Sequence, residues 1–351
     1  MESSVVTAIP KVHLDNNARY LSSNAMSVGP LLPGSVGETQ TGDLLNFLLA
    51  SESASVQRSM MRLLQEVADA GMPPAPACLN ASAHAVAAQV DQELASQLRA
   101  AMIEGDPALR LHYQPLVAAS GGNLVGFEAL LRWTSPTRGQ VAPHQVLRLA
   151  AGSGLADALD FWILQEAVAN GAPWLARNGG LTLAVNVTGA LISSSHAILA
   201  MRAALAAHGV ATNRVCLEVT EEVLLDQSAK RGLHALQQAG FRLAIDDFGV
   251  GHSGLQRLHE FKADVVKLDM KFFLGRRYPD DDLAALRSLV RTLRQFGITV
   301  VAEGIAGPQD YTVACQVGCQ VLQSFWFSEA ISASAATELV ETDRCPWSVS
   351  P

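Results

Sequence analysis

Short apolar runs alternate with longer segments of helical period from Leu111 almost to the C-terminus. Runs of β-branched and other apolar residues are typical of buried strands, and apolar positions three and four residues apart are typical of helices. The predicted strands are Leu111–Val117, Leu124–Trp133, Leu181–Val187, Val215–Val219, Arg242–Asp246, Val265–Leu268, Thr299–Ala302 and Gln320–Phe325. The predicted helices are Leu155–Asn170, His196–His208, Ala229–Gln238, Ser253–Phe261, Asp281–Phe296 and Pro308–Val317.

Eight strands with helical crossovers predict an α/β fold, a TIM-like (β/α)8 barrel. Glycines stand where four of the helices should end, as left-handed terminal residues do: Gly209, Gly240, Gly297 and Gly318. Only Ala118–Asn123 joins the first two strands, which is too short for a helical crossover. We therefore expect the first strand to be antiparallel to the second, in a hairpin that turns at Gly121-Gly122.

The region before the barrel has a different composition. Residues 1–42 are rich in Ser, Asn, Gly, Pro and Thr and predict a leader that is partly disordered. Residues 43–95 predict a mainly helical extension, with one helix over 43–70, a break at the proline run of 72–76 and a second helix over Ala81–Glu104. The barrel domain is predicted over 96–340 and a tail over 341–351. The 43–70 helix could serve dimerisation or regulation, or could pack on the barrel exterior.

Composition argues against a nucleic-acid-binding protein, a disulfide-bonded protein and a membrane-spanning protein. The net charge of −8 and pI of 5.6 disfavour a basic nucleic-acid-binding surface, so we expect no DNA partner. Five cysteines without a C-x-x-C pair indicate a reducing compartment rather than a disulfide framework. With neither a signal peptide nor an apolar run of membrane-spanning length, the sequence predicts a cytoplasmic protein without a membrane span.

Polar side chains gather at the predicted C-terminal ends of the strands, where barrel enzymes carry their reactive groups. These residues are Glu128, Asn186, Glu218, Glu221, Asp246, Asp247, Lys267, Asp269, Glu303 and Gln323. A single acid at such a position is often a helix cap, but several carboxylates at one mouth repel one another unless a cation neutralises them. A ligand set of oxygens without His or Cys favours Mg²⁺ or Mn²⁺ over zinc.

Two features of this set indicate phosphorus chemistry. Asp246 and Asp247 are adjacent and could bridge two cations, an arrangement that favours in-line displacement at phosphorus. Lys267 lies inside an apolar strand, where a lysine is uncommon, and would place a positive charge near the phosphate or the attacking water. The alternative for Lys267 is a salt bridge to a neighbouring acid.

The segment Gly249-Val250-Gly251-His252-Ser253-Gly254 matches the dinucleotide-binding pattern G-x-G-x-x-G. Asp246 and Asp247 stand directly before it and would repel a pyrophosphate, and the eight-strand pattern disfavours a doubly wound sheet. We interpret it as a glycine-rich loop that covers the site.

Residues 96–335 resemble an EAL domain, the bacterial phosphodiesterase module for cyclic di-GMP. The resemblance rests on Tyr113-Gln114-Pro115-Leu116, Glu128-Ala129-Leu130-Leu131-Arg132, Val185-Asn186-Val187-Thr188, Leu217-Glu218-Val219-Thr220-Glu221, Asp246-Asp247-Phe248-Gly249, Val266-Lys267-Leu268-Asp269, Ala302-Glu303-Gly304 and Gln323. These motifs stand in the order of the family.

The resemblance implies a role for each matching residue. Glu128, Asn186, Glu218 and Asp246 would hold the first Mg²⁺ or Mn²⁺, and Asp246 with Asp247 the second. Lys267, Glu303 and Gln323 would form the catalytic group, in which Lys267 and Glu303 orient and deprotonate the attacking water. Gln114, Leu130, Arg132 and Asp269 would bind the substrate, and Glu221 would anchor the glycine-rich loop. The implied reaction is hydrolysis of cyclic di-GMP to linear pGpG, and the family resemblance also implies a homodimer. Residues 1–95 could bind a regulatory protein partner.

The resemblance is weakest after Gln323. The family usually has a glycine next and a proline later, whereas this chain reads Ser324-Phe325-Trp326-Phe327-Ser328-Glu329-Ala330. All the expected metal ligands and the lysine are present, which favours an active hydrolase. A non-catalytic cyclic di-GMP receptor that acts through protein partners is the alternative, because changes in this exit loop could slow turnover while sparing binding.

Overall fold

A computed structural model describes residues 76–194, 196–249, 261–270 and 280–342. The chain divides into two compact units, Met1–Phe47 and Leu48–Pro351, and every described residue belongs to the second. The predicted leader, the 43–70 helix, most of the glycine-rich loop with its helix Ser253–Phe261, and the tail from 343 onwards lie outside the described residues. Of the described helices, none is both long and apolar enough to cross a bilayer.

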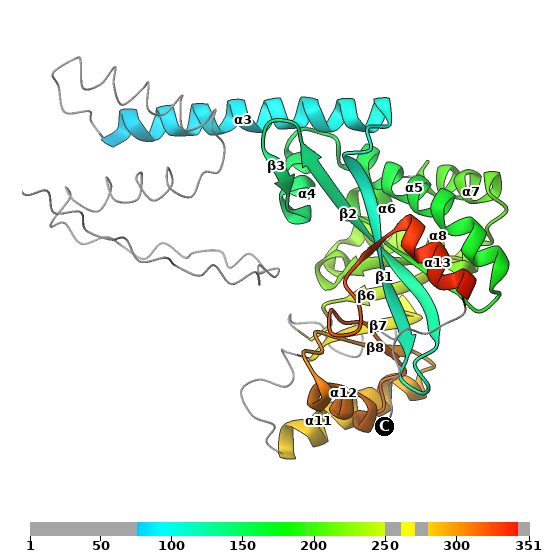
Figure 1. Cartoon of the computed structure of the whole chain (residues 1–351). Helices are drawn as coiled ribbons and strands as arrows, with labels where there is room; N and C mark the ends of the chain where they lie inside the picture. The colour runs from blue at the N-terminus through cyan, green and yellow to red at the C-terminus, as the bar shows by residue number, and fades with distance from the viewer. Residues whose placement is uncertain (1–75, 195, 250–260, 271–279, 343–351) are drawn as a thin grey trace, which may run out of the picture. The chain divides into compact units, whose positions relative to one another are not determined.

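Eight strands close into a barrel, which confirms the predicted fold class (Figure 1). They are β1 (Leu109–Ala118), β2 (Leu124–Ser135), β4 (Thr182–Asn186), β5 (Val215–Thr220), β6 (Arg242–Asp246), β7 (Val265–Asp269), β8 (Thr299–Glu303) and β9 (Val321–Leu322). Strand β1 is antiparallel to both β2 and β9, whereas the other neighbours in the barrel run parallel. Two short strands, β3 (Gly139–Val141) and β10 (Ile331–Ser332), pair with β2 and β1 outside the ring.

The β1–β2 hairpin follows the prediction. Gly121 and Gly122 have φ angles of 86° and 68°, a left-handed conformation that glycine adopts without steric cost and that suits the twist of a tight hairpin. The amide of Ala118 donates to the carbonyl of Asn123 at 2.8 Å and so closes the turn. The four predicted terminal glycines also have positive φ, between 67° and 97°.

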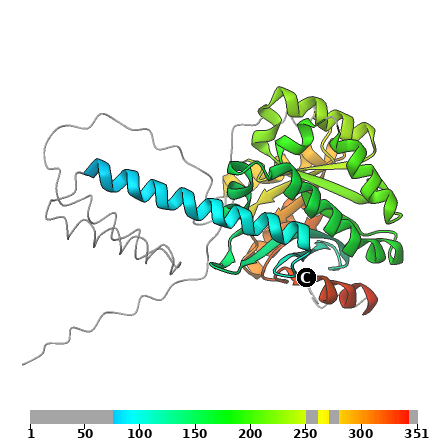
Figure 2. The same cartoon turned by 90° about the horizontal axis from the view of Figure 1, so that it is seen from above.

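Helices surround the barrel (Figures 1 and 2). They are α3 (Pro76–Glu104), α4 (Pro143–Gly152), α5 (Ala156–Arg177), α6 (Gly189–Ser193), α7 (Ala197–Ala207), α8 (Gln227–Gln238), α11 (Asp280–Gln295), α12 (Pro308–Val317) and α13 (Ala333–Thr342), with the 3-10 turns η1 (Thr212–Arg214) and η2 (Glu221–Leu225). Leu94 and Leu98 of α3 are buried in the main core, so the C-terminal half of this helix packs on the barrel domain. Helix α3 also runs across position 96, where the domain boundary is predicted.

Two predicted bounds differ clearly from the structure. The predicted strand Gln320–Phe325 is only two residues long, because the carbonyl of Ser324 accepts from the amides of Phe327 and Ser328 and turns the chain out of the sheet. The helix predicted to end at Asn170 continues through Pro173 to Arg177. Its last turns bury Trp174 and Leu175, and this packing outweighs the local cost of the proline.

Candidate active site

The barrel interior is built in layers that follow the two-residue period of its strands. A lower apolar layer contains Leu116, Ala184, Cys216, Ala244, Val265 and Val301. Two residues further along the parallel strands stand Asn186, Glu218, Asp246, Lys267 and Glu303. Because alternate side chains of a strand point to the same face, these polar groups form the next layer, at the C-terminal mouth. Strand register therefore brings together residues that are far apart in the chain.

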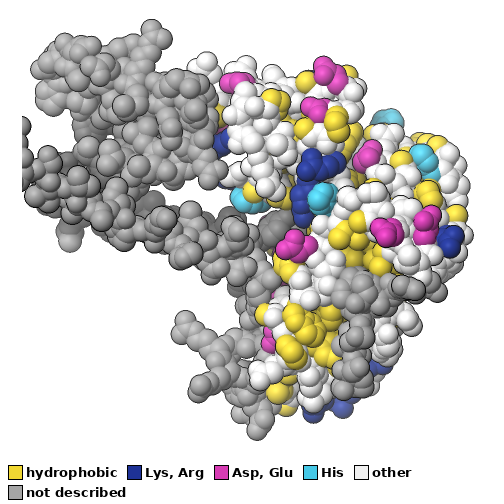
Figure 3. All heavy atoms as spheres, viewed as in Figure 1, with side chains coloured by type: hydrophobic (Ala, Val, Ile, Leu, Met, Phe, Trp, Pro, Cys, Tyr) yellow, Lys and Arg dark blue, Asp and Glu magenta, His cyan; other side chains and the backbone are white. Residues whose placement is uncertain are grey.

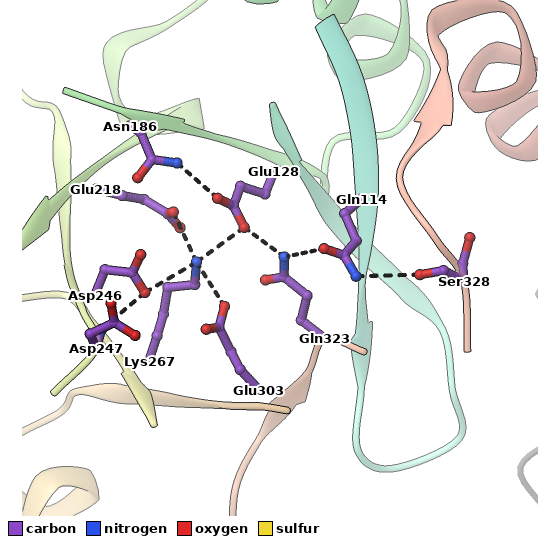
Figure 4. A network of polar contacts seen from close by, with 10 residues as sticks. All are labelled: Gln114, Glu128, Asn186, Glu218, Asp246, Asp247, Lys267, Glu303, Gln323 and Ser328. Atoms are coloured by element: carbon purple, nitrogen blue, oxygen red, sulfur yellow. Dashed lines mark hydrogen bonds and ion pairs between the residues drawn. The ribbon is translucent and has the colours of Figure 1, made fainter. Parts of the chain in front are cut away.

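Lys267 lies at the centre of this polar layer (Figure 4). Its side chain is 2% exposed, and its ammonium faces four carboxylates. Nζ lies 2.8 Å from Glu303 Oε1, 2.9 Å from Glu218 Oε2, 3.1 Å from Glu128 Oε2 and 3.5 Å from Asp246 Oδ1. The salt bridge considered for Lys267 is thus real, and all its partners are predicted metal ligands or catalytic groups.

Amide side chains fix the position of Glu128 from both sides. Asn186 donates through Nδ2 to Glu128 Oε1 at 2.8 Å, and Gln323 donates through Nε2 to Glu128 Oε2 at 2.6 Å. The Gln323 amide also donates to Gln114 Oε1 at 3.0 Å, and Gln114 in turn donates to the carbonyl of Ser328 at 3.3 Å (Figure 4). Within the described residues Gln323 Oε1 is buried without a hydrogen-bond partner, which leaves one acceptor aimed into the site.

The electrostatics show that the site holds more negative charge than Lys267 neutralises. Burial and the neighbouring Glu128 carboxylate raise the pKa of Glu218 well above its usual value. Burial raises the pKa of Glu303 to about 8, although Lys267 opposes the shift. Burial alone would lower the pKa of Lys267, but the carboxylates around it, led by Asp246, raise it well above its ordinary value. The ammonium therefore stays charged, and further positive charge would stabilise the cluster.

Glu128 differs from the other buried acids. Burial raises its pKa, but the charge of Lys267 and the hydrogen bonds from Gln323, Lys267 and Asn186 together hold the pKa below its usual value. These contacts favour the ionised form of Glu128, the form in which a carboxylate can bind a cation.

Asp247 adds a carboxylate at the rim of the cluster. It has a left-handed φ of 53°, and its amide donates to Asp246 Oδ1 at 3.0 Å. Desolvation and the neighbouring Asp246 carboxylate raise the pKa of Asp247 to about 6. One carboxylate oxygen from each of Asp246, Asp247 and Glu303 lies within 4.8 Å of the other two. Clustered oxygen donors with surplus negative charge suit a hard divalent cation such as Mg²⁺ or Mn²⁺.

The remaining predicted residues lie further along the same elements. Leu130 follows Glu128 by two residues and Arg132 by four, so both share its face of β2. Asp269 ends β7 and pairs in register with Glu303. Glu221 is buried at the start of η2, directly after β5, whereas the loop it is predicted to anchor lies outside the described residues beyond Gly249.

The anchoring of the exit loop, Ser324–Ala330, has no counterpart in the predicted set of site residues. Ser324 replaces the usual glycine, and its hydroxyl donates to the carbonyl of Ile305 at 2.5 Å and accepts from the amide of Trp326 at 2.9 Å. The same loop presents the Ser328 carbonyl to Gln114. Backbone acceptors carry no residue-type signal, so only the structure reveals that this loop supports Gln114.

Comparisons with known proteins agree with this geometry. The model of the EAL domain family matches residues 95–330. The chain is 32% identical over 260 residues to the cyclic di-GMP phosphodiesterase NbdA of Pseudomonas aeruginosa, an alignment that covers 73% of this chain and 32% of NbdA. The chain spans about a third of the length of the curated relatives it matches.

Two solved structures are similar in fold and sequence. One is the PaMucR phosphodiesterase in complex with c-di-GMP, with a TM-score of 0.64, 32% identity and coverage of 70% of this chain and 99% of that chain. The other is BlrP1 of Klebsiella pneumoniae in a manganese/cy-diGMP complex, with a TM-score of 0.56, 30% identity and coverage of 64% of this chain and 57% of that chain.

Proposed function

The chain belongs to the EAL domain family, and from that premise we propose that it hydrolyses cyclic di-GMP to linear pGpG with bound Mg²⁺ or Mn²⁺. The observation that supports this most is the complete set of oxygen ligands around Lys267, in which four carboxylates share one buried ammonium. Relatives named as cyclic di-GMP phosphodiesterases and a neighbour solved with manganese and cy-diGMP support the same substrate and metal class.

The polar cluster contains enough oxygen donors for two cations. In this proposal Glu128, Asn186, Glu218 and Asp246 would hold one cation, and Asp246, Asp247 and Glu303 would hold a second. When bound, the cations lower the pKa of water and neutralise charge on the phosphate. The raised pKa values of Glu218, Asp247 and Glu303 fit this role, because burial and then the neighbouring carboxylates disfavour the charged forms, which a bound cation would stabilise.

Residues of the chain transfer protons, orient the attacking water and bind the substrate. Glu303 accepts a proton from the attacking water, and Lys267 orients that water and balances the charge of the phosphate. The water oxygen bonds to phosphorus, the bond from phosphorus to the 3′ oxygen breaks, and that oxygen takes up a proton, which leaves a 5′-phosphate and a 3′-hydroxyl. Gln323 holds Glu128 in place. Gln114, Leu130, Arg132 and Asp269 bind the substrate.

We also propose how the protein assembles, where its partner binds and where in the cell it acts. Glu221 anchors the glycine-rich loop and couples metal binding to contacts between the two copies of a homodimer. Residues 1–95 offer a site for a regulatory protein partner of this cytoplasmic enzyme. Light scattering of the full chain measures its molar mass and so tests the dimer. The mass of a monomer at micromolar concentration would contradict it.

Product analysis tests the proposed activity. The full chain is incubated with cyclic di-GMP and Mn²⁺, and pGpG is followed by chromatography, with a chelator and with Glu128→Ala as controls. Metal-dependent pGpG from the wild type alone supports the proposal. Binding without turnover would instead support the receptor alternative and implicate the Ser324–Ala330 loop. If the chain neither binds nor cleaves cyclic di-GMP, both the hydrolase proposal and the receptor alternative are refuted.

A further inference from the structure

The hairpin strands β1 and β2 carry a cationic group just beyond the active site. In their register, Gln114 lies opposite Glu128, His112 opposite Leu130 and Arg110 opposite Arg132. Side chains two and four residues apart on a strand share one face. Arg110 and His112 therefore stand on the face that carries Gln114, and Arg132 on the face that carries Glu128. We refer to Arg110, His112 and Arg132 as the cationic row.

The members of the cationic row influence one another. Arg110 and Arg132 are directly opposite across an antiparallel pair, where like charges are destabilising. Burial lowers the pKa of His112, and the charges of Arg132 and Arg110 lower it further. The imidazole Nδ1 lies 3.1 Å from the carbonyl of Ala330, which keeps the ring on this face. A phosphate bound between two arginines that are opposite in the register would offset this repulsion.

Arg110 is available for such an anion. The residue is exposed, and its Nη1 donates to the carbonyl of Pro107 at the long distance of 3.4 Å. Among the described residues no carboxylate lies within 4.0 Å of its guanidinium. In Figure 3, Lys or Arg side chains gather beside a His side chain over the region where Figure 1 shows β2.

Spacing indicates which part of a ligand would reach this row. Four residues of strand separate Arg110 from Gln114, which is about 13 Å along the strand at about 3.3 Å per residue. Arg110 now contacts the carbonyl of Pro107, but it is exposed and can turn toward the mouth, where its extended side chain would span about half of that distance. A cyclic dinucleotide has two phosphodiesters, and only one can lie at Lys267. The other lies across the ring from it, and the outer part of the hairpin offers it cationic groups.

We propose that Arg110, opposite Arg132, binds the phosphodiester of cyclic di-GMP that is not cleaved, and thereby favours a substrate with two phosphates over one with a single phosphate. This inference rests on the proposed function, since it names a second contact for the same substrate. The planar guanidinium fork offers a bidentate fit to a phosphate, which an ammonium does not. Arg110 is a binding residue and takes no part in the chemical step.

Kinetics with two substrates test the proposal on the full chain with Mn²⁺. For Arg110→Gln, the KM for cyclic di-GMP should rise about tenfold or more, which is the loss of one charge-assisted contact of about 1.5 kcal/mol. The kcat should stay within a factor of two. The KM for bis(p-nitrophenyl) phosphate, which has one phosphodiester, should not change. Arg110→Lys should recover only part of the loss, and Arg202→Gln on α7, an exposed arginine away from the hairpin, should match the wild type.

Each contrary result has a distinct meaning. An unchanged KM for cyclic di-GMP in Arg110→Gln, or an equal rise for both substrates, overturns the inference while the proposed hydrolysis stands. If the wild type does not turn over cyclic di-GMP, calorimetric binding of the dinucleotide replaces KM as the readout. Weaker binding by Arg110→Gln than by Arg202→Gln then supports the inference, and equal binding or none overturns it.

Discussion

Lys267 Nζ lies 2.8 Å from Glu303 Oε1, although the two residues are not register partners on β7 and β8. Lys267 pairs with Val301, and Glu303 pairs with Asp269, so the contact runs diagonally across the two strands. Both side chains point into the barrel, where the ammonium also reaches acids from three other strands. The diagonal contact places an acid and a cation next to each other at the point where water is proposed to be activated.

Loss of the Lys267 ammonium should destabilise the metal-free protein. Lys267→Met keeps the length of the side chain but leaves four carboxylates, of which Glu128 and Glu218 are buried, without their counter-charge. Removing one partner of a buried ion pair costs about 3–5 kcal/mol. Chemical denaturation in chelator should show a loss of this order, and turnover should disappear. The matched control is Lys262→Met, at an exposed position. Equal stability of the two variants would contradict the central role of Lys267.

Divalent cations should stabilise the folded chain through the acidic cluster. A ligand present at a hundred times its Kd adds about 2.7 kcal/mol to the free energy of unfolding. Mn²⁺ or Mg²⁺ should therefore raise the melting temperature of the wild type. Asp246→Asn should abolish most of the shift, because Asp246 is common to both proposed metal positions. Asp157→Asn, at an exposed site on α5, should keep it. A full shift in Asp246→Asn would refute the ligand assignment.

Asp160 should make the stability of the barrel depend on pH. It is buried on α5 and accepts from the amide of Thr188 at 3.0 Å, and burial raises its pKa from the usual 3.8 to about 6. An acid whose pKa is raised by folding stabilises the fold fully below its unfolded pKa and loses that contribution as the pH rises through the folded value. The window is therefore about pH 4 to 6.

The comparison of wild type with Asp160→Asn isolates this effect. The wild type should lose stability relative to the variant between pH 4 and pH 7, by about 3 kcal/mol at most. Urea denaturation of both proteins at four pH values across this range measures the difference. A difference that is constant with pH would show that Asp160 titrates normally.

Gly232 should be intolerant of a methyl group. A Cβ at this position of α8 would lie 1.9 Å from the carbonyl oxygen of Ile192 and 2.8 Å from its carbon. Alanine improves helix propensity by about 1 kcal/mol over glycine, but overpacking against a backbone typically costs 1–3 kcal/mol or more. We expect Gly232→Ala to lower the melting temperature, whereas Gly152→Ala, with open space around its Cβ, should not. Stabilisation by Gly232→Ala would contradict the close packing of α6 on α8.

Much of the fold is predictable because the barrel strands have a strong apolar pattern. The bounds of β6 agree with the prediction at both ends, Arg242 and Asp246. The structure adds β3 and β10, which have three and two residues and are too short to show a period. The short helix α6 was also missed, because five residues cannot establish a helical repeat.

The sequence predicts the residues at the strand ends of the site better than it predicts the contacts of the hairpin. The rule that strand ends meet at one mouth identifies Glu128, Glu218, Lys267 and Glu303 as neighbours, and the structure joins them through one ammonium. The opposed pair Arg110 and Arg132 depends on the exact hairpin register, which the sequence alone leaves free. The assigned roles of the site residues stay predictions.

The most direct measurement of the central claim is the rate of pGpG formation by the wild type and by Glu128→Gln at saturating Mn²⁺. The substitution keeps the shape of the side chain and removes the charge that a cation requires. It also replaces one of the two oxygens that accept from Asn186 and Gln323 by an NH2 donor. We expect metal-dependent formation of pGpG by the wild type and a rate at least a hundredfold lower, or about 2.7 kcal/mol in the barrier, for the variant. Equal rates for the two proteins would contradict the account.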